Sequence, residues 1–419
     1  MASERSLRIL SGQVYTIDSK SGDYNAQLKK GEVVNLGGTE YYILQIKDNT
    51  NNGMQAMAVA PVIDEKVDTS EIVIAYAGTN AKDMNDIKTD IQTVVGKNKE
   101  YMTERQRIPY TTTFITVPVK SQITSAETFA KNIHRKYPNA EIITTGHSLG
   151  EYIALYIAAE NKWKNIGFNG PDPYEILSTE AQKWVTENPG MYYNYRNKED
   201  KIGNYGGNGT GAEILVDMNM GRHIKDTLAF HGLNSWKFDQ DGELLIEATK
   251  ENKEARQKRA EKIIDVKMSE LTILSKKLKA SGGGLSRSEV IFLDNTKAFL
   301  AVDYISKSMK IGLEAVIEVY EEAITEAEET WDKGIELAKA IATELSYSEI
   351  IDALQTRGVT KHAVVWEPTA YYRQKISEAL EIGEKFDRLA LQIKQGIQKL
   401  EETDKELADQ IEEGVQIIG

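Results

Sequence analysis

Residues 140–160 read AEIITTGHSLGEYIALYIAAE, and this stretch decides the fold of the first half of the chain. Its first six residues include several β-branched side chains and predict a short strand. Its last ten residues predict a helix that begins directly behind the pentapeptide Gly146-His-Ser-Leu-Gly150. A G-x-S-x-G motif between a strand and a helix is the setting of a nucleophile elbow, a sharp turn that exposes the serine hydroxyl. This context favours a catalytic Ser148 over a serine with only a structural role in the turn.

The size and composition of the chain indicate a globular protein with more than one domain. Its 419 residues exceed the length of one ordinary core, and 41% of them are hydrophobic. The formal net charge of −13 argues against nucleic-acid binding as the main activity. The chain has no cysteine, which excludes disulfides, thiolate metal sites and cysteine nucleophiles.

The sequence offers no conventional targeting segment. The N-terminus has no apolar region of the kind found in Sec signal peptides, and no run of about 18 apolar residues predicts a membrane span. If the protein leaves the cell, we expect it to use another export route.

Strand and helix signals alternate over residues 1–244, which predicts a mainly parallel sheet covered by helices, the α/β arrangement. Residues 121–136 predict an amphipathic helix, and Asn51-Asn-Gly53 has the chemistry of a hairpin turn. Short apolar or β-branched runs predict strands at residues 41–47, 54–60, 72–76, 165–169 and 192–196.

The strand signals fade after residue 244, and residues 245–419 predict a separate, elongated all-α domain. Residues 244–279 favour a helix, Ser286-Arg-Ser-Glu289 is a capping box that would begin a second one, and residues 310–345 predict another. A last helix of about 40 residues is predicted from apolar side chains at three- and four-residue steps. They are Ile376, Ala379, Ile382, Phe386, Leu389, Ile393, Ile397, Leu400, Leu407 and Ile411. We expect this stripe to face a core formed with other helices or with another chain.

A catalytic serine needs a base within hydrogen-bond reach, and the chain has only five histidines. The side chain of His147, beside the serine, is expected to point away. His134 lies in a helix ahead of the elbow, and His362 lies in the helical half. His231 lies near the end of the α/β half, where triads in the chain order Ser, Asp, His place their histidine. His231 is therefore the favoured base, and His223 is the alternative.

The base needs a carboxylate that fixes its tautomer. Asp200 lies in the loop behind the strand predicted at 192–196, and such a loop opens at the same sheet edge as the elbow. Asp172, in Gly170-Pro-Asp-Pro173, directly follows the preceding strand and is the alternative, although it suits a turn equally well. Asp200 is the favoured acid.

Acyl transfer also needs N–H donors for an oxyanion. One is expected from the backbone of Leu149, the residue after the nucleophile. The second is expected from Ala77-Gly78-Thr79-Asn80, which follows the buried strand at 72–76, and Thr79 is the candidate. The alternative for this loop is an ordinary turn at the end of a strand.

Taken together, these segments resemble class 3 (fungal-type) lipases over roughly residues 1–244. Similarity is found in the strand and oxyanion loop at 74–79, the elbow at 146–150, the strand end at 168–171 and the acid segment at 197–200. The histidine segment is similar at 231–236, together with Asp241-Gly242. The resemblance implies an α/β-hydrolase fold and hydrolysis of lipid or phospholipid esters without a cofactor. It implies Ser148 as nucleophile, Asp200 as acid, His231 as base, and Thr79 with Leu149 as oxyanion hole. Ala77 stands where the family usually has arginine, and Glu151 where it usually has glycine.

The helical half resembles the LXG-type targeting domains of toxins that Gram-positive bacteria export by type VII secretion. Those domains normally stand at the N-terminus, so the order here is similar to that of reverse-arranged lipase toxins of staphylococci. The resemblance implies a secreted lipase toxin exported by a non-Sec route. It also implies small helical accessory or chaperone proteins that bind the long helices, and an immunity protein.

Two other functions are considered. Residues 146–152 also resemble the nucleophile segment of acyl-carrier-protein transacylases, in which Glu151 would be expected, and Ala229-Phe-His231 is similar to their histidine segment. However, no arginine follows Ser148 before Met191 to hold a malonyl carboxylate. The other alternative is a non-catalytic binding protein built on a hydrolase fold.

Overall fold

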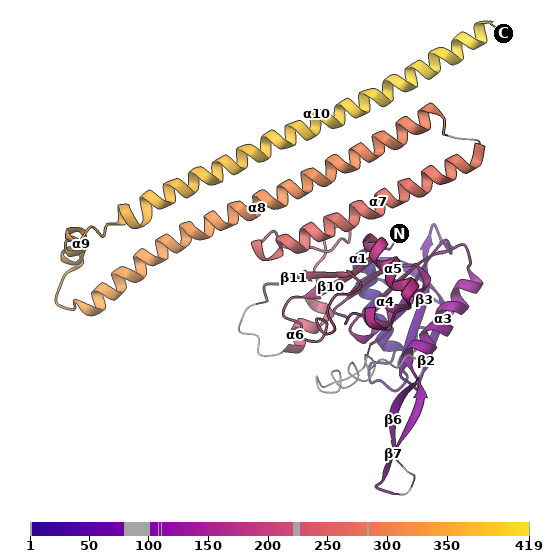
Figure 1. Ribbon diagram of the computed structural model, residues 1–419. Helices are drawn as coiled ribbons and strands as arrows, with labels where there is room; N and C mark the ends of the chain where they lie inside the picture. Colours follow the sequence, from indigo (N-terminus) through magenta and orange to yellow (C-terminus); the bar gives the residue numbers. More distant parts are fainter. Residues whose placement is uncertain are drawn as a thin grey trace. The chain divides into compact units, whose positions relative to one another are not determined.

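The computed structural model describes residues 2–78, 101–107, 109, 111–220, 227–282 and 285–418. By its internal contacts the chain divides into two compact units, Met1–Glu247 and Ala248–Gly419. The first unit contains the strands, and the described part of the second is built from helices and their connections (Figure 1).

The core of the first unit is a mixed sheet with the strand order β1-β2-β3-β5-β8-β9-β10-β11, and β4 pairs with β3. The run from β5 to β11 is parallel, as predicted, whereas β1, β2, β3 and β5 pair with one another antiparallel. The strands are β1 (Val33–Leu36), β2 (Thr39–Asn49), β3 (Met54–Ile63), β4 (Lys66–Val67), β5 (Glu71–Tyr76), β8 (Glu141–Gly146), β9 (Lys164–Phe168), β10 (Tyr192–Asn197) and β11 (Glu213–Val216).

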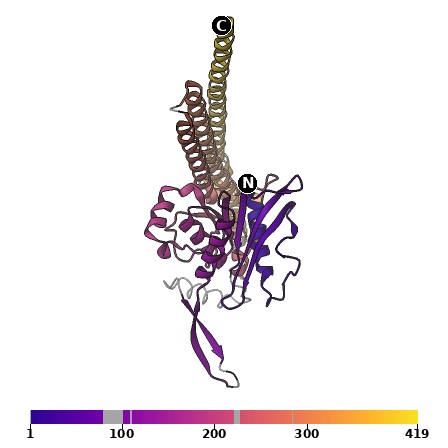
Figure 2. The same cartoon turned by 90° about the vertical axis from the view of Figure 1, so that its right-hand side faces the viewer.

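The predicted hairpin is confirmed. β2 and β3 pair antiparallel, and Gly53 in their turn has φ 72°, a left-handed conformation that glycine adopts without steric cost. A separate two-stranded sheet, formed by β6 (Tyr101–Arg107) and β7 (Phe114–Lys120), projects from the unit (Figures 1 and 2).

Helices cover both faces of the main sheet, as two neighbouring threonines of β8 show. Thr144 Oγ1 donates to the carbonyl of Ala154 in α4 at 2.9 Å, whereas Thr145 Oγ1 lies 2.8 Å from Ser11 Oγ in α1. Because successive residues of a strand point to opposite faces, α4 and α1 lie on opposite sides of the sheet. The helices of this unit are α1 (Glu4–Gln13), α3 (Gln122–Lys136), α4 (Leu149–Asn161), α5 (Thr179–Glu187) and α6 (Thr227–His231). Short 3₁₀ turns are η1 (Val14–Ile17), η2 (Tyr174–Ile176), η3 (Pro189–Met191) and η4 (Leu233–Ser235).

The largest core lies between the sheet and the helices α3, α4 and α5. Helix α4 is buried on all sides from Leu149 to Ala159, which fits its nearly continuous apolar sequence. The predicted helix at 121–136 is confirmed as α3, and Ser121 caps it by accepting a hydrogen bond from the amide of Thr124 at 3.2 Å.

The second unit begins with a 3₁₀ turn, η5 (Lys250–Asn252), followed by α7 (Lys253–Gly282), α8 (Arg287–Ile341), α9 (Tyr347–Thr356), the π-helical turn η6 (His362–Trp366) and α10 (Glu367–Ile418). The capping box of Ser286 and Glu289 is confirmed. The helix predicted at 310–345 is confirmed over 310–341, but it is not a further helix, because these residues belong to the continuous α8. The helix predicted from residue 244 begins only at Lys253, since the amide of Leu244 donates to Glu4 Oε2 at 2.6 Å instead.

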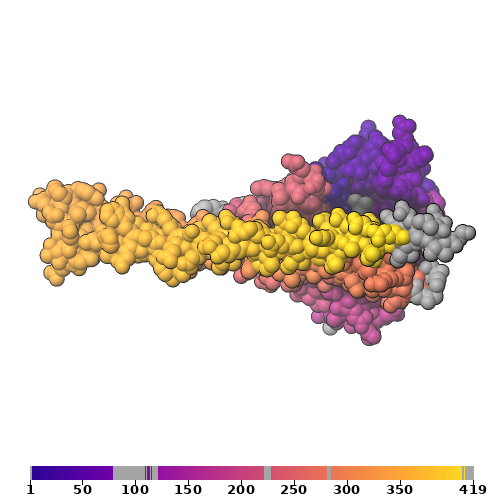
Figure 3. Space-filling view, turned by 90° about the horizontal axis from the view of Figure 1, so that it is seen from above, coloured from indigo at the N-terminus to yellow at the C-terminus, as the bar shows by residue number. Residues whose placement is uncertain are grey.

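The long final helix is confirmed, but its apolar residues do not all face a core. Ala379 and Ile397 are buried, and Lys394 and Tyr372 contact Asp303 and Tyr320 of α8. A second apolar stripe is exposed, at Ile382, Leu389, Ile393, Leu400 and Leu407. Figure 3 views the unit from the face along which α10 lies. The apolar residues predicted as one stripe therefore lie on two faces of α10. Helix α8 packs against one of these faces and leaves the other exposed.

Among the residues that the structure describes, none of the helices is both long and apolar enough to cross a lipid bilayer.

Candidate active site

The turn between β8 and α4 has the backbone of a strained elbow. Ser148 has φ 59° and ψ −130°, a conformation that costs free energy in any residue with a side chain. Backbone hydrogen bonds hold it, since the Ser148 amide donates to the carbonyl of Phe168 at 3.1 Å and the Gly150 amide to that of His147 at 2.9 Å. The Ser148 side chain does not cap α4, so the hydroxyl is not committed to the helix.

Both glycines of the pentapeptide are required by close packing. A Cβ atom on Gly146 would lie 2.4 Å from the carbonyl carbon of Gly150, and one on Gly150 would lie 2.2 Å from the carbonyl oxygen of Tyr76. Real Cβ contacts are not this short, so the strand, the helix and the end of β5 approach one another only because side chains are missing here.

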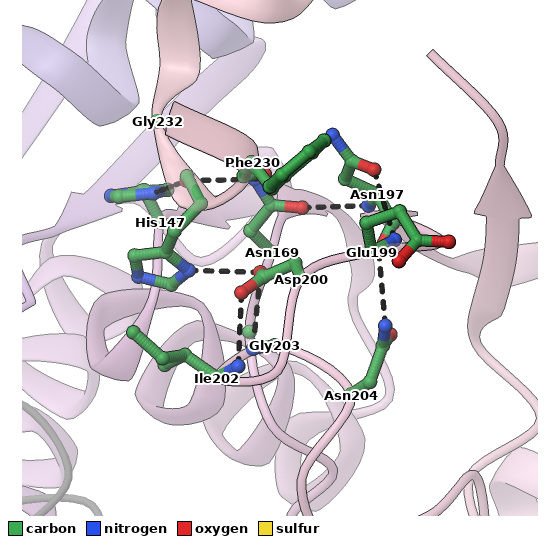
Figure 4. Close-up of polar contacts among 12 residues, drawn as sticks. His147, Asn169, Asn197, Glu199, Asp200, Ile202, Gly203, Asn204, Phe230 and Gly232 are labelled. Carbon is green, nitrogen blue, oxygen red and sulfur yellow. Dashed lines mark hydrogen bonds and ion pairs between the residues drawn. The ribbon is translucent and has the colours of Figure 1, made fainter. Parts of the chain in front are cut away.

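His231 and Asp200 form a buried pair. His231 Nδ1 lies 2.8 Å from Asp200 Oδ2, and the two residues are 4% and 1% exposed. The carboxylate also accepts the amide of Ile202 at 2.9 Å on Oδ1 and that of Gly203 at 3.1 Å on Oδ2 (Figure 4). These donors hold the carboxylate in place as an acceptor, which in turn fixes the hydrogen of the imidazole on Nδ1.

The other nitrogen of His231 is left open. Its Nε2 is buried and, within the described part of the chain, has no hydrogen-bond partner. A buried acceptor without a partner is costly, so this nitrogen needs a donor such as a hydroxyl. The pair therefore has the form of a general base whose orientation is fixed from one side.

The main chain of His231 is held from two sides. Its carbonyl accepts Nδ2 of Asn169 at 2.8 Å and lies 2.7 Å from Nε2 of His147 (Figure 4). Asn169 Oδ1 in turn accepts the amide of Asn197 at 2.9 Å, next to the loop that carries Asp200. Asn169 has φ 52°, a left-handed conformation that asparagine tolerates better than most residues.

The expectation that His147 points away from the site was wrong. Its ring lies 4.7 Å, centroid to centroid, from the ring of His231, and its Nδ1 lies 3.0 Å from the hydroxyl of Tyr15. Burial and the neighbouring His231 lower the pKa of His147 to about 3, so its ring is neutral at physiological pH. The sequence could not show this, because both partners are distant along the chain.

The two expected oxyanion donors can be placed only in part. Leu149 is the first residue of α4, so its N–H is one of those that lack an acceptor within the helix. Thr79 lies outside the described residues, whereas Ala77 and Gly78 ahead of it are described and buried. A Cβ on Gly78 would lie 2.7 Å from the carbonyl oxygen of His147, so the loop from β5 approaches the elbow closely.

The alternatives considered for acid and base occupy other positions. Asp172 accepts the hydroxyl of Thr210 at 2.6 Å and the amide of Tyr174 at 2.8 Å, and so ties two loops together. His134 is exposed and packs against Trp163, with ring centroids 5.7 Å apart. His362 belongs to the second unit. His223 lies outside the described residues.

Glu151, at the start of α4, is fully buried behind the elbow. Its Oε1 accepts Nδ2 of Asn165 at 2.6 Å, and Oε2 has no partner among the described residues. Burial raises the pKa of Glu151 well above its usual value, while the bond from Asn165 and the charge of Arg196 oppose the shift. Glu151 fits here because Gly167 and Gly170 leave room, since a Cβ on Gly170 would lie 2.4 Å from Cβ of Glu151.

Solved structures that are similar to the chain include fungal lipases. A Rhizomucor miehei lipase in complex with its propeptide is 15% identical, with 51% of this chain and 67% of that chain covered and a TM-score of 0.32. A mutant form of MDLA from Penicillium cyclopium is 13% identical, with 51% and 77% covered and a TM-score of 0.29. Another fungal lipase is 11% identical, with 55% and 81% covered and a TM-score of 0.30. No family model and no curated protein matches the chain.

Proposed function

We propose that the protein is a serine carboxylic-ester hydrolase of the lipase or phospholipase A type. The observation that carries the proposal is the buried pair of His231 and Asp200, joined at 2.8 Å with Nε2 of the histidine left without a partner. It occurs in the same unit as a strained serine at the strand-to-helix turn. The three side chains come in the chain order Ser, Asp, His that is usual for nucleophile elbows.

In the acylation step, His231 Nε2 takes the proton of the Ser148 hydroxyl while Oγ attacks the carbonyl carbon of a lipid ester. Asp200 stabilises the imidazolium that forms. The negative oxygen of the tetrahedral intermediate accepts the N–H of Leu149 and, in this proposal, that of Thr79. When the intermediate collapses, the imidazolium gives its proton to the leaving alcohol, and the acyl group stays on Ser148.

In the deacylation step, His231 takes a proton from water, and the hydroxide oxygen attacks the acyl-serine carbonyl. The second tetrahedral intermediate passes through the same oxyanion site. Collapse releases the fatty acid and returns the proton to Ser148. The cycle uses no cofactor.

The test is fatty-acid release from vesicles of phospholipid and from triglyceride emulsions, with Ser148→Ala and His231→Ala as comparisons. We expect the wild type to release fatty acid and both variants to lose activity by at least about a thousandfold, since either residue alone disables the triad. Equal rates for wild type and Ser148→Ala would overturn the mechanism. Hydrolysis of acyl thioesters alone would favour a transacylase, and no turnover of either class would favour a binding protein.

For the helical unit we propose small helical accessory proteins as partners. The support is the exposed stripe of Ile382, Leu389, Ile393, Leu400 and Leu407 on α10, which recurs at steps of seven and four residues and so suits a helix lying alongside. The change Leu389→Glu together with Leu400→Glu should abolish a complex with such a protein in light-scattering measurements. Gln395→Glu, an exposed position outside the stripe, is the matched control. A stable complex with the double variant would contradict this proposal.

We also propose that the chain is an exported toxin that leaves the cell by a type VII-like route and is neutralised by an immunity protein. The support is the order of its two units and the absence of cysteine in the sequence. Disabling the type VII machinery of the producing cell should stop release of the protein. Unchanged release would overturn the route, and equal growth inhibition by wild type and Ser148→Ala in target cells would overturn the toxin's proposed chemistry.

A further inference from the structure

Tyr15 joins three parts of the candidate site that are far apart in the sequence. It lies in the turn η1, and its hydroxyl lies 3.0 Å from Nδ1 of His147 in the elbow. Gly78, in the loop expected to form the oxyanion hole, packs against the same hydroxyl. A Cβ on Gly78 would lie 2.5 Å from this oxygen, so the two groups are in close contact.

The direction of these hydrogen bonds follows from the carbonyl of His231. A carbonyl oxygen only accepts, so His147 Nε2, at 2.7 Å, must carry the hydrogen. The ring is neutral, and Nδ1 is therefore an acceptor. The Tyr15 hydroxyl shares its one hydrogen between Nδ1 at 3.0 Å and the carbonyl oxygen of His147 at 3.1 Å, so both of its acceptors belong to His147. Burial raises the pKa of Tyr15, so the hydroxyl keeps its proton for this bond.

A directed chain of hydrogen bonds results, which runs from Tyr15 to His147 and from His147 to the main chain of the base, and Gly78 packs against its first member. Next to Gly78, Ala77 stands where the lipases that this segment resembles usually have arginine. The close packing of Gly78 against the Tyr15 hydroxyl holds this loop without a charged side chain. At the last link of the chain, the bond fixes the backbone from which His231 projects.

Resting on the hydrolase function proposed above, we propose that Tyr15 and His147 are positioning residues that hold the oxyanion loop and the base in register with the nucleophile. Neither needs to touch the substrate. Their effect is on the geometry in which Ser148, His231 and the oxyanion donors meet. Displacements of about 1 Å in such a geometry cost up to about a hundredfold in rate.

The first test is Tyr15→Phe, which removes only the hydroxyl. We expect kcat to fall about 10- to 100-fold while KM stays within about threefold, because the transition state loses its alignment and substrate binding does not. Tyr156→Phe is the matched control, since it removes another tyrosine hydroxyl, bonded to Glu127 at 2.8 Å, from the same unit. A kcat of Tyr15→Phe within threefold of the wild type, or a change in KM alone, would overturn the proposal.

Two substitutions of His147 separate the links of the chain. In His147→Gln the amide nitrogen can replace Nε2 and keep the bond to the carbonyl of His231. In His147→Asn the amide reaches only the position of Nδ1, beside Tyr15. We expect the larger loss of kcat in His147→Asn, and the opposite order would contradict the anchoring of His231.

A measurement without turnover separates this proposal from the hydrolase function. Nitrogen NMR of protein labelled at its five histidines should show His147 neutral with the hydrogen on Nε2. The Nδ1 resonance should shift in Tyr15→Phe and stay unchanged in Tyr156→Phe. A hydrogen on Nδ1 of His147 in the wild type would overturn the directed chain. If the wild type hydrolyses no lipid, the hydrolase function fails while this readout still decides the hydrogen bonding.

Discussion

The change Asp200→Asn tests the role of the buried pair in most detail. In the wild type, Asp200 Oδ2 accepts both Nδ1 of His231 at 2.8 Å and the amide of Gly203 at 3.1 Å. An asparagine would place its amide oxygen where Oδ1 accepts the amide of Ile202. Its NH₂ group would then stand at the position of Oδ2 and face two other donors, Nδ1–H of His231 and the amide of Gly203. His231 escapes this conflict by moving its hydrogen to Nε2, which then has no lone pair for the proton of Ser148.

A triad histidine in the wrong tautomer lowers kcat about 10⁴-fold in a serine protease in which the same change was made. Here this loss corresponds to about 5 kcal/mol of lost transition-state stabilisation, at roughly 1.4 kcal/mol per tenfold. The assay is the initial rate of fatty-acid release at saturating substrate. Glu199→Gln, an exposed neighbour in the same loop, is the control and should match the wild type. A kcat of Asp200→Asn within tenfold of the wild type would show that Asp200 does not set the tautomer of His231.

Three further predictions concern the groups around the site. Asp172→Asn should lower the free energy of unfolding by about 1–3 kcal/mol, because a buried NH₂ group would face the amide and the hydroxyl of Thr210. Its kcat should change far less than that of Asp200→Asn. Equal losses of kcat in the two variants would make Asp172 the acid. The pKa of Glu151 is raised above its ordinary value of 4.5, mainly by burial. As the pH rises above 4.5, the unfolded chain releases the Glu151 proton while the folded state keeps it. The free energy of unfolding therefore falls with rising pH. Glu151→Gln should therefore unfold at higher denaturant concentration than the wild type at pH 8, and no difference between pH 5 and pH 8 would contradict a protonated Glu151. The pKa of His147 is lowered from 6.5 to about 3, mainly by burial. As the pH falls below 6.5, His147 therefore binds a proton in the unfolded chain but stays neutral in the folded state. Between pH 7 and pH 5 the wild type should lose about 1–2 kcal/mol that His147→Gln does not lose, as measured by denaturant unfolding, and parallel losses would show that His147 titrates in the folded state.

The parts of the site that follow from local sequence could be predicted. The β-branched run at 140–145, the pentapeptide and the apolar helix behind it fix the strand, the turn and α4 within a few residues of one another. Asp200 and His231 were singled out by their position behind strands and by the order of triad residues. The structure brings these two side chains together at 2.8 Å.

The residues that support the pair could not be predicted, because their contacts are set by the tertiary fold. Tyr15 meets His147 across 132 residues of sequence, and Asn169 meets the carbonyl of His231 across 62. Nothing in the composition around these residues distinguishes them from ordinary core or turn residues. The error about His147 has the same cause, since a side chain next to the nucleophile turns toward whatever partner the fold supplies.

In the helical unit, the spacing of apolar residues predicted the helices but not which of their faces is buried. Apolar steps of three and four residues predicted a long helix correctly, but they could not separate the buried face of α10, with Ala379 and Ile397, from the exposed stripe with Leu389 and Leu400. Both faces satisfy the same spacing rule. In the same way, helix propensity alone did not reveal that α8 runs unbroken from Arg287 to Ile341.

Covalent labelling of the protein by a fluorophosphonate, followed by peptide mapping, tests directly whether Ser148 is the nucleophile. A serine activated by a neighbouring base displaces fluoride and becomes phosphonylated, whereas ordinary serines react far more slowly. We expect a single labelled peptide that contains Ser148, with labelling lost in His231→Ala and slowed by lipid substrate. Labelling at another residue, or undiminished labelling of Ser148→Ala, would contradict this role of Ser148.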